Sequence, residues 1–462
     1  MFRSSVSFKL GFYFLFVFAS CNPGSATKES QNNDSTSPKV NLIDGHPGWI
    51  MQGNIYEVNI RQYTPEGTFK AFEKHLDRLK EMGVQTLWFM PINPISKVDR
   101  KGLLGSYYAV ADYTQINPEY GNLEDWKALV TKAHNMGFKV IIDWVPNHSG
   151  ADNRWLNEHP DFYVRDSSGK AAVPYDWTDT RKLDYKNMAL QDSMINSMKY
   201  WITTSDIDGF RCDVAGDVPD EFWKRCILEL KKAKADIFML AEADKPSLHT
   251  DGFDATYAWA MFAMMKKVAK GERDATALDS VRNTVDTSFP ANELKMFFTS
   301  NHDENSWNKA DYGTMPGAIH APFAVFTQTM PHDVPLIYSG QEEPVLDSIS
   351  FFYKDPIHFK NYGQFKFYET LLELRKNNPA LAANASFKKI NVGDEKALYA
   401  YVRVAEGKKI LVILNLSKKE QPVKITDAGL LGNPYNLFMG TKRQLTNKEW
   451  KLEPWGYVVY VY

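Results

Sequence analysis

The chain has 462 residues and a formal net charge of -2 at pH 7. A chain of this length can bury a large core, and its near-neutral charge gives no bias toward nucleic acid, so we expect no nucleic-acid partner. Aromatic residues make up 14% of the sequence, which suits a large core or a binding surface that stacks on rings. These numbers favour a folded protein of enzyme size.

The N-terminus predicts an export signal. Two basic residues precede the apolar run LGFYFLFVFAS, which is too short to span a bilayer but suits a signal-peptide core. The run ends at Cys21, and Ala19 and Ser20 before it resemble the cleavage box of bacterial lipoproteins, with Phe18 where Leu is usual. We therefore predict a signal peptide over residues 1–20 and a lipidated Cys21, with an ordinary secretory signal cut nearby as the alternative.

A lipidated protein would be anchored to a membrane of the bacterial cell envelope, for example the outer membrane, on its periplasmic or its surface-exposed face. Residues 21–47 are polar and rich in Pro, Ser and Asn, which predicts a flexible tether behind the anchor. The two other cysteines, Cys212 and Cys226, exclude a disulfide framework. We expect two buried thiols, with a single bridge between them as the alternative.

From residue 54 onward, short apolar runs alternate with helical stretches, as in repeated β-α units around a parallel sheet. Clear helical spacing is found at 67–83, 122–137 and 187–205. The predicted strands are 55–60, 84–90, 139–145, 207–213, 237–242, 253–257, 295–300 and 335–340. Eight such units predict an α/β fold, a (β/α)₈ TIM barrel over residues 48–380.

Two regions depart from the repeat. The interval after the third strand is too long for one helix, and its polar, aromatic stretch 148–186 predicts a small inserted domain. After the barrel, alternating runs such as ALYAYVRV and KKILVILNL are separated by turn signals. Residues 381–462 therefore predict a C-terminal antiparallel β-sandwich.

Polar clusters stand at the ends of four predicted strands. They are Asp143 with Asn147–His148, Arg211 with Asp213, Glu242, and His302–Asp303. In a β/α barrel, residues at the C-terminal ends of the strands build the active site. A single carboxylate there is often a cap or a salt-bridge partner, but four clusters in one register predict a catalytic site.

The spacing of Arg211 and Asp213 points both side chains to the same face, into the barrel mouth. We expect Arg211 to lower the pKa of Asp213 and keep it ionised, as a nucleophile requires. Glu242 should lie near other carboxylates, whose repulsion and partial desolvation would raise its pKa until it can donate a proton. Cleavage of a glycosidic bond needs such a pair, and a separation of about 5–5.5 Å would give retention of anomeric configuration.

The stretches DWVPNH (143–148), GFRCD (209–213) and FTSNHD (298–303), together with Glu242, resemble the four signature regions of the α-amylase superfamily of glycoside hydrolases. The likeness extends from about residue 54 to the C-terminus. It implies that Asp213 is the nucleophile, Glu242 the general acid/base, and Asp303 the carboxylate that grips the distorted sugar.

The resemblance also implies substrate-binding residues. His148 and His302 would hydrogen-bond sugar hydroxyls, with loop packing as the alternative for His148. Tyr108 would be the aromatic platform under the sugar, and Asp143 the orienting carboxylate. Arg211 is also predicted to be a substrate-binding residue.

Asn147 matches a position that often supplies a calcium ligand in this superfamily. Calcium needs six to eight oxygens. The candidate partners are Asp176, Asp179 and Asp184. A structural hydrogen bond from Asn147 is the alternative, and no organic cofactor is implied. The insertion also carries aromatic residues that could be sugar platforms or core: Trp155, Trp177 and Tyr175.

The sequence departs from many α-amylases after the nucleophile, where Gly216 and Asp217 replace a Lys-His pair that contacts sugars on the leaving-group side. DVAGDVPDEFW and RKLD (181–184) are instead similar to the cyclodextrin- and pullulan-acting branch. That branch usually has an extra N-terminal domain, for which a first barrel strand near residue 55 leaves no room.

These features predict a retaining, endo-acting hydrolase of α-1,4-glucosidic bonds in starch or maltodextrins. One alternative is a cyclodextrin- or pullulan-acting hydrolase, or a 4-α-glucanotransferase, of the same superfamily. A remote alternative is a non-catalytic starch-binding surface protein, and the presence of Asp213, Glu242 and Asp303 counts against it.

Overall fold

The computed structural model describes residues 40–308, 319–344 and 348–462. The predicted signal peptide, Cys21 and most of the predicted tether lie outside the described residues. Within the described part of the chain, no helix is long and apolar enough to cross a membrane.

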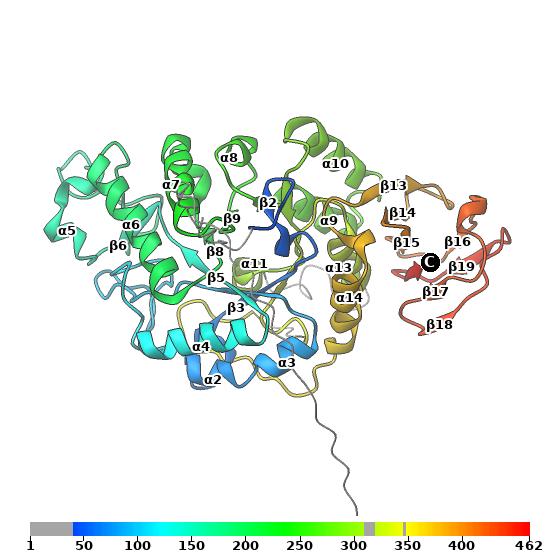
Figure 1. The fold of residues 1–462 in the computed structure, drawn as a ribbon, viewed down its shortest axis with the longest axis horizontal. Helices are drawn as coiled ribbons and strands as arrows, with labels where there is room; N and C mark the ends of the chain where they lie inside the picture. The colour runs from blue at the N-terminus through cyan, green and yellow to red at the C-terminus, as the bar shows by residue number, and fades with distance from the viewer. Residues whose placement is uncertain (1–39, 309–318, 345–347) are drawn as a thin grey trace, which may run out of the picture. The chain divides into compact units, whose positions relative to one another are not determined.

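Eight parallel strands form the central sheet, in the order β11-β10-β9-β8-β5-β4-β3-β12. Figure 1 labels β3, β5, β8 and β9 of this sheet. They are β3 (Ile55–Val58), β4 (Thr86–Phe89), β5 (Lys139–Trp144), β8 (Gly209–Cys212), β9 (Phe238–Ala241), β10 (Ala255–Tyr257), β11 (Leu294–Met296) and β12 (Leu336–Tyr338). The sheet closes where the main-chain N–H of Val334 donates to Lys295 O and that of Leu336 donates to Phe297 O, each at 2.9 Å. The predicted (β/α)₈ barrel is confirmed, with each strand in its predicted place and shorter than predicted.

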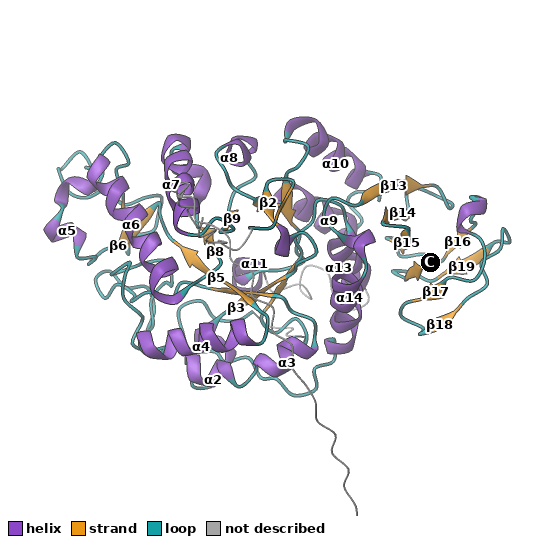
Figure 2. Cartoon of the chain, in the orientation of Figure 1, coloured by secondary structure: helices purple, strands orange, loops and turns teal. Residues whose placement is uncertain are grey.

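Helices surround the strands (Figure 2). Every residue of β4, β8 and β9 is buried, because helices cover the outside of the sheet and side chains fill its interior. Cys212 and Cys226 are buried free thiols, as expected. The helices are α1 (Ile60–Tyr63), α2 (Phe69–Glu73), α3 (Leu76–Glu81), α4 (Leu123–Asn135), α6 (Met188–Ser205), α7 (Asp220–Ala233), α8 (Pro246–Thr250), α9 (Trp259–Lys270), α10 (Ala277–Ser288), α11 (His302–Asn308), α13 (His320–Thr329) and α14 (Phe365–Asn377).

Two of the predicted helices begin at side-chain caps. The side chain of Asn122 accepts from the N–H of Asp125 before α4, and Asn187 caps α6 in the same way. The predicted helix over 67–83 is instead divided into α2 and α3. The tighter bond from His75 N to Phe72 O (2.8 Å) marks the break.

The predicted insertion begins and ends in a two-stranded antiparallel ladder of β6 (His148–Gly150) and β7 (Thr180–Lys182). Between them lie α5 (Trp155–Glu158) and the short η2 (Pro160–Phe162). The ring of Trp155 packs at 4.9 Å from Tyr113 and 5.6 Å from Phe162, measured between centroids, and is 5% exposed. Trp155 is therefore a core residue and not a sugar platform.

The C-terminal part contains a six-stranded antiparallel sheet and a separate two-stranded one. Their strands are β13 (Ser386–Ile390), β14 (Leu398–Ala405), β15 (Lys408–Asn415), β16 (Gln421–Val423), β17 (Tyr435–Asn436), β18 (Thr441–Lys442), β19 (Trp450–Leu452) and β20 (Tyr457–Val461). Both sheets contribute to one core, in which Val423 and Leu452 pack with Ile413. The predicted C-terminal β domain is confirmed, and Tyr399 packs its ring 5.6 Å from Phe326 of α13.

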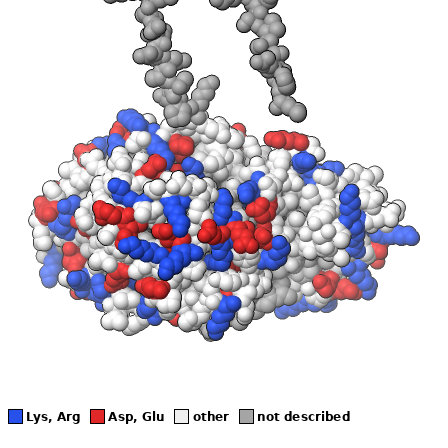
Figure 3. Space-filling model, turned by 60° about the horizontal axis from the view of Figure 1, so that its bottom comes forward, with Lys and Arg blue, Asp and Glu red and all other residues white. Residues whose placement is uncertain are grey.

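Charged side chains of both signs lie intermingled on the face drawn in Figure 3. Neither sign dominates that face, in keeping with the net charge of -2.

Candidate active site

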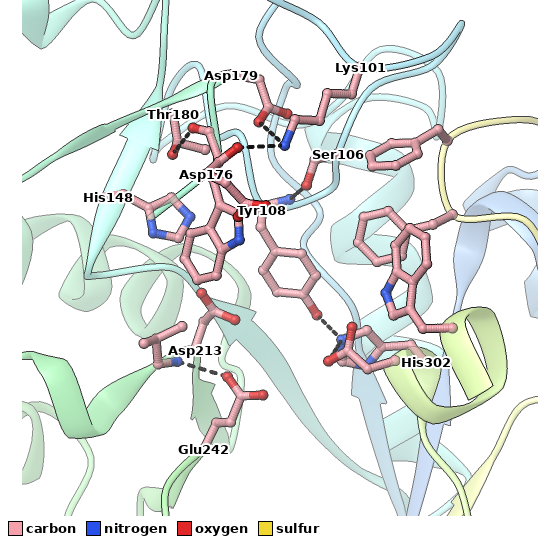
Figure 4. A pocket seen from close by; sticks show the side chains of 16 residues that line it. Lys101, Ser106, Tyr108, His148, Asp176, Asp179, Thr180, Asp213, Glu242 and His302 are labelled. Carbon is pink, nitrogen blue, oxygen red and sulfur yellow. Dashed lines mark hydrogen bonds and ion pairs between the residues drawn. The ribbon is translucent and has the colours of Figure 1, made fainter. Parts of the chain in front are cut away.

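A pocket of about 400 Å³ lies at the C-terminal ends of the barrel strands (Figure 4). Six of the predicted site residues line it: Tyr108, His148, Asp213, Glu242, His302 and Asp303. Asp143 and Arg211 are fully buried and contact these lining residues. The structure therefore brings all eight predicted catalytic and substrate-binding residues together.

Arg211 organises the floor of the pocket. Its Nη1 donates to Oδ1 of Asp143 and to Oδ1 of Asp213, both at 2.9 Å. Its Nη2 forms an ion pair with Oε1 of Glu242 at 2.8 Å, and its Nε donates to the hydroxyl of Tyr257 at 3.0 Å. Since these partners lie at the ends of β5, β8, β9 and β10, one guanidinium fixes the ends of four strands.

The charge balance of this cluster differs from our prediction. Burial raises the pKa of Asp213 well above its usual range, Glu242 adds to this effect, and Arg211 opposes it. Arg211 lowers the pKa of Asp213, as predicted, but the expected net result is wrong, because burial and the nearby Glu242 outweigh the guanidinium. Burial likewise raises the pKa of Asp143 to about 6, against the effect of Arg211. The cluster therefore retains a proton readily.

A strained turn after β8 orients Glu242. Val214 has a φ of 45°, in the left-handed region that β-branched residues rarely adopt. In this conformation its main-chain N–H donates to Oε2 of Glu242 at 2.8 Å. Strain of this kind is typical of functional sites, where surrounding contacts hold the backbone in place.

His302 forms the second half of the site. Its Nδ1 lies 2.5 Å from Oε1 of Glu57, and its Nε2 lies 2.8 Å from the hydroxyl of Tyr108 and 3.2 Å from Oδ2 of Asp303. Burial disfavours a charged ring, but Asp303 and Glu57 outweigh it and raise the pKa of His302 well above its usual value. The hydroxyl of Tyr108 in turn donates to Oδ2 of Asp143 at 3.0 Å, which joins the two halves.

His148 lies in the opposite wall and is 1% exposed. Burial lowers the pKa of its ring to about 3, and the nearby Lys182 acts in the same direction, so the ring is neutral. Trp177 lines the pocket with its ring 5.1 Å from that of His148. Tyr175 packs 4.7 Å from Trp177, is 64% exposed, and donates from its hydroxyl to the carboxylate of Asp217.

Several residues of the site were missed in the sequence. Glu57 lies in the apolar run IYEVNI, where a lone carboxylate on a predicted barrel strand was the available signal. Tyr257, the last residue of β10, was also missed. The aromatic wall of Trp307, Phe351 and Phe352 comes from segments outside the predicted strands, with rings 5.4 and 5.8 Å from Trp307, and no motif marks it.

The residues around Asn147 do not fit a calcium ion. Oδ1 of Asn147 accepts from the ammonium group of Lys182. Of the candidate acids, Asp179 lies 3.7 Å from Lys101, and Asp184 accepts from the main-chain N–H of Lys186. No group of three or more His, Cys, Asp or Glu that could hold a metal ion occurs in residues 40–308, 319–344 and 348–462. Calcium requires six to eight oxygens, and here a cationic side chain already engages the amide oxygen of Asn147.

Carboxylates held by a shared arginine at the C-terminal end of a (β/α)₈ barrel have the composition of a site that cleaves glycosidic bonds, and the protein is a glycoside hydrolase. The model of the alpha-amylase catalytic domain matches residues 26–181 and 172–360. The chain belongs to the α-amylase family.

Named relatives differ in their activities. Alpha-amylase MalA of Haloarcula japonica is 26% identical over 396 residues, which cover 82% of this chain and 57% of that protein. A cyclomaltodextrinase of Thermoanaerobacter pseudethanolicus is 25% identical over 404 residues, which cover 78% of this chain and 65% of that protein. The chain thus spans less than two-thirds of the length of either relative.

Solved structures match over nearly their whole length. An alpha-amylase from Lactobacillus plantarum superposes with a TM-score of 0.80 at 29% identity, covering 90% of this chain and 99% of that chain. The maltogenic alpha-amylase AmyB from Thermotoga neapolitana superposes with a TM-score of 0.81 at 28% identity, with the same coverage.

Proposed function

We propose that the protein is a retaining, endo-acting hydrolase of α-1,4-glucosidic bonds in starch or maltodextrins, which acts through a covalent glycosyl-enzyme intermediate. The observation that carries this proposal is the sharing of Arg211 by Asp213 and Glu242, which both face one pocket. Two carboxylates in contact with one guanidinium are close enough to act on the same glycosidic bond.

In the first step, a carboxylate oxygen of Asp213 attacks the anomeric carbon while Glu242 transfers its proton to the leaving oxygen. The glycosidic C–O bond breaks, the leaving chain departs as an alcohol, and the sugar remains esterified to Asp213. In the second step, the Glu242 carboxylate takes a proton from a water that attacks the same carbon and releases Asp213. Two displacements at one carbon retain its configuration.

These steps need an ionised Asp213 and a protonated Glu242. Arg211 contacts both carboxylates and opposes the effect of burial on the pKa of Asp213, which favours the ionised nucleophile. Asp303 is 38% exposed at its side chain and faces the pocket next to a protonated His302, where it is placed to bind sugar hydroxyls. The ring of Tyr108 provides an aromatic face for the sugar.

A second candidate is hydrolysis of cyclic or short maltodextrins. Two observations favour it: Asp217 is engaged by Tyr175 where a Lys-His pair is common, and relatives include cyclomaltodextrinases. A transferase of the same family would instead use a sugar hydroxyl as acceptor in the second step.

A product time course from soluble starch, maltoheptaose and β-cyclodextrin tests these proposals, with the anomer of the first products read by NMR. Short α-anomeric products from starch would support the retaining endo-hydrolase. Faster attack on cyclodextrin would favour the second candidate, and products longer than the starting chain would favour the transferase. β-Anomeric first products would contradict the covalent intermediate.

We also propose that the mature protein is a lipoprotein of the bacterial cell envelope, anchored through Cys21. This proposal is supported by the apolar run and the small residues before Cys21. Cys21→Ala should move the protein from the membrane fraction to the soluble fraction, and continued membrane association would count against the anchor.

A further inference from the structure

The inserted domain leaves and re-enters the barrel through the β6–β7 ladder, in which His148 lies opposite Lys182. Just outside the ladder, the main-chain N–H of Leu183 donates to Asn147 O at 3.3 Å. The side chains of Asn147 and Lys182 thus meet at the base of the insertion, next to a residue that lines the pocket.

A positive charge stands at the amide oxygen that the family resemblance assigns to calcium. The ammonium group of Lys182 donates to Oδ1 of Asn147, whose side chain is fully buried. A single cationic side chain from the protein thus occupies a position where a metal would need six to eight oxygens.

The same contact determines how the amide of Asn147 is oriented. An ammonium group can only donate, so the amide oxygen must face Lys182. The amide nitrogen then faces Nδ1 of His148 at a distance of 3.2 Å. Because an amide NH₂ also only donates, Nδ1 must accept, and a neutral ring then carries its hydrogen on Nε2.

We propose that Lys182 is a positioning residue that takes the place of a metal ion: its ammonium group fastens the inserted domain at Asn147 and, through that amide, holds His148 as the Nε2–H tautomer. In this state Nε2 of His148 is a hydrogen-bond donor. The inference rests on contacts within the protein, so it does not depend on which α-glucan is the substrate.

The first test concerns the metal. The wild-type full chain is treated with EDTA, its calcium content is measured by mass spectrometry, and its melting temperature is recorded with EDTA and with added calcium chloride. We expect the purified protein to contain no calcium before EDTA is added. Its melting temperature should be the same in EDTA and in calcium chloride. Stoichiometric calcium, or a fall in melting temperature that calcium reverses, would overturn the proposal.

The second test concerns the tautomer, which a purely structural role of Lys182 would leave unchanged. In protein labelled with ¹⁵N-histidine, we expect the ring signals of His148, assigned by their loss in His148→Gln, to show Nε2–H. Lys182→Met should lower the melting temperature and mix the two tautomers, because the amide is then free to turn. Lys182→Arg, which keeps a cationic donor, should preserve the wild-type signals.

Lys186→Met is the matched control, since Lys186 is exposed in the same segment, and it should change neither property. A single Nε2–H signal in Lys182→Met would refute the positioning role. If that variant does not fold, the wild-type protein still tests the proposal, because a ring hydrogen found on Nδ1 of His148 would overturn it.

Discussion

Nη1 of Arg211 lies 2.9 Å from Oδ1 of Asp213, and both side chains are almost completely removed from solvent. The same nitrogen reaches Asp143, and the neighbouring Nη2 reaches Glu242. Burying a charge is costly unless it is paired and hydrogen-bonded, and three carboxylates provide that pairing here. The buried strand β8 therefore carries Arg211 because the guanidinium pairs with the carboxylates of the active site.

Arg211→Lys should show whether the site needs only a positive charge at this position or also the planar shape of the guanidinium. Lysine keeps one positive charge but has no planar fork, so it cannot hold Asp143, Asp213 and Glu242 at once. We expect kcat on maltoheptaose to fall by at least about 10²-fold, because misplaced catalytic groups lose their alignment with the reacting carbon. Arg273→Lys, an exposed position, is the control. Near-normal kcat in folded Arg211→Lys would refute the organising role of the guanidinium.

Glu242→Gln and Asp213→Asn should respond differently to the leaving group. A phenol that leaves readily needs little proton donation, so Glu242→Gln should lose about 10²–10⁴-fold on maltoheptaose and much less on a nitrophenyl maltoside in the first step. Asp213→Asn should lose activity on both substrates, because no nucleophile remains. Pre-steady-state release of nitrophenol measures this step. Equal losses for Glu242→Gln on the two substrates would contradict its role as the acid.

Glu57→Gln should change the pH dependence of activity. The negative charge of Glu57 helps to raise the pKa of His302, so removing that charge should lower it. The protonated His302 would then be lost at a lower pH, and the alkaline limb of kcat/KM should move toward neutral pH. Glu342→Gln is the control, since Glu342 is equally buried but pairs with Arg78. An unmoved alkaline limb in Glu57→Gln would show that His302 does not set it.

The barrel and most of the site were predictable because their signals are local. Strand and helix periodicity marked the β-α units, and Asp143, Asp213 and Glu242 stand where strands end. Glu57 was missed because a single carboxylate in an apolar strand does not tell which partner it meets across the barrel.

Other features depend on the assembled fold. Phe351 and Trp307 come from segments that only tertiary contacts bring to the pocket. The net direction of the pKa shift of Asp213 depends on how deeply this carboxylate is buried and on the nearby Glu242, and sequence spacing reveals neither. The contact between Lys182 and Asn147 likewise arises because β6 and β7 pair.

Asp208, just before β8, should make stability depend on acid pH. Its buried carboxylate lies within 3.0 Å of Lys139, Lys234 and His134. Burial opposes its ionisation, but these partners outweigh it and hold the pKa of Asp208 well below its usual range. A carboxylate with a depressed pKa contributes stability above its unfolded value of about 3.9, and this contribution is lost as the pH falls through the folded value.

We therefore expect Asp208→Asn to destabilise the protein by roughly 1–3 kcal/mol at neutral pH, because Lys139, Lys234 and His134, which are partly buried, lose their shared carboxylate. The difference from wild type should shrink as the pH falls below about 4, where the wild-type carboxylate begins to lose its advantage. Denaturant unfolding at several pH values measures this, with Glu449→Gln, an exposed position, as the control. A difference that stays constant down to acid pH would mean that Asp208 stabilises the barrel through packing and not through its charge.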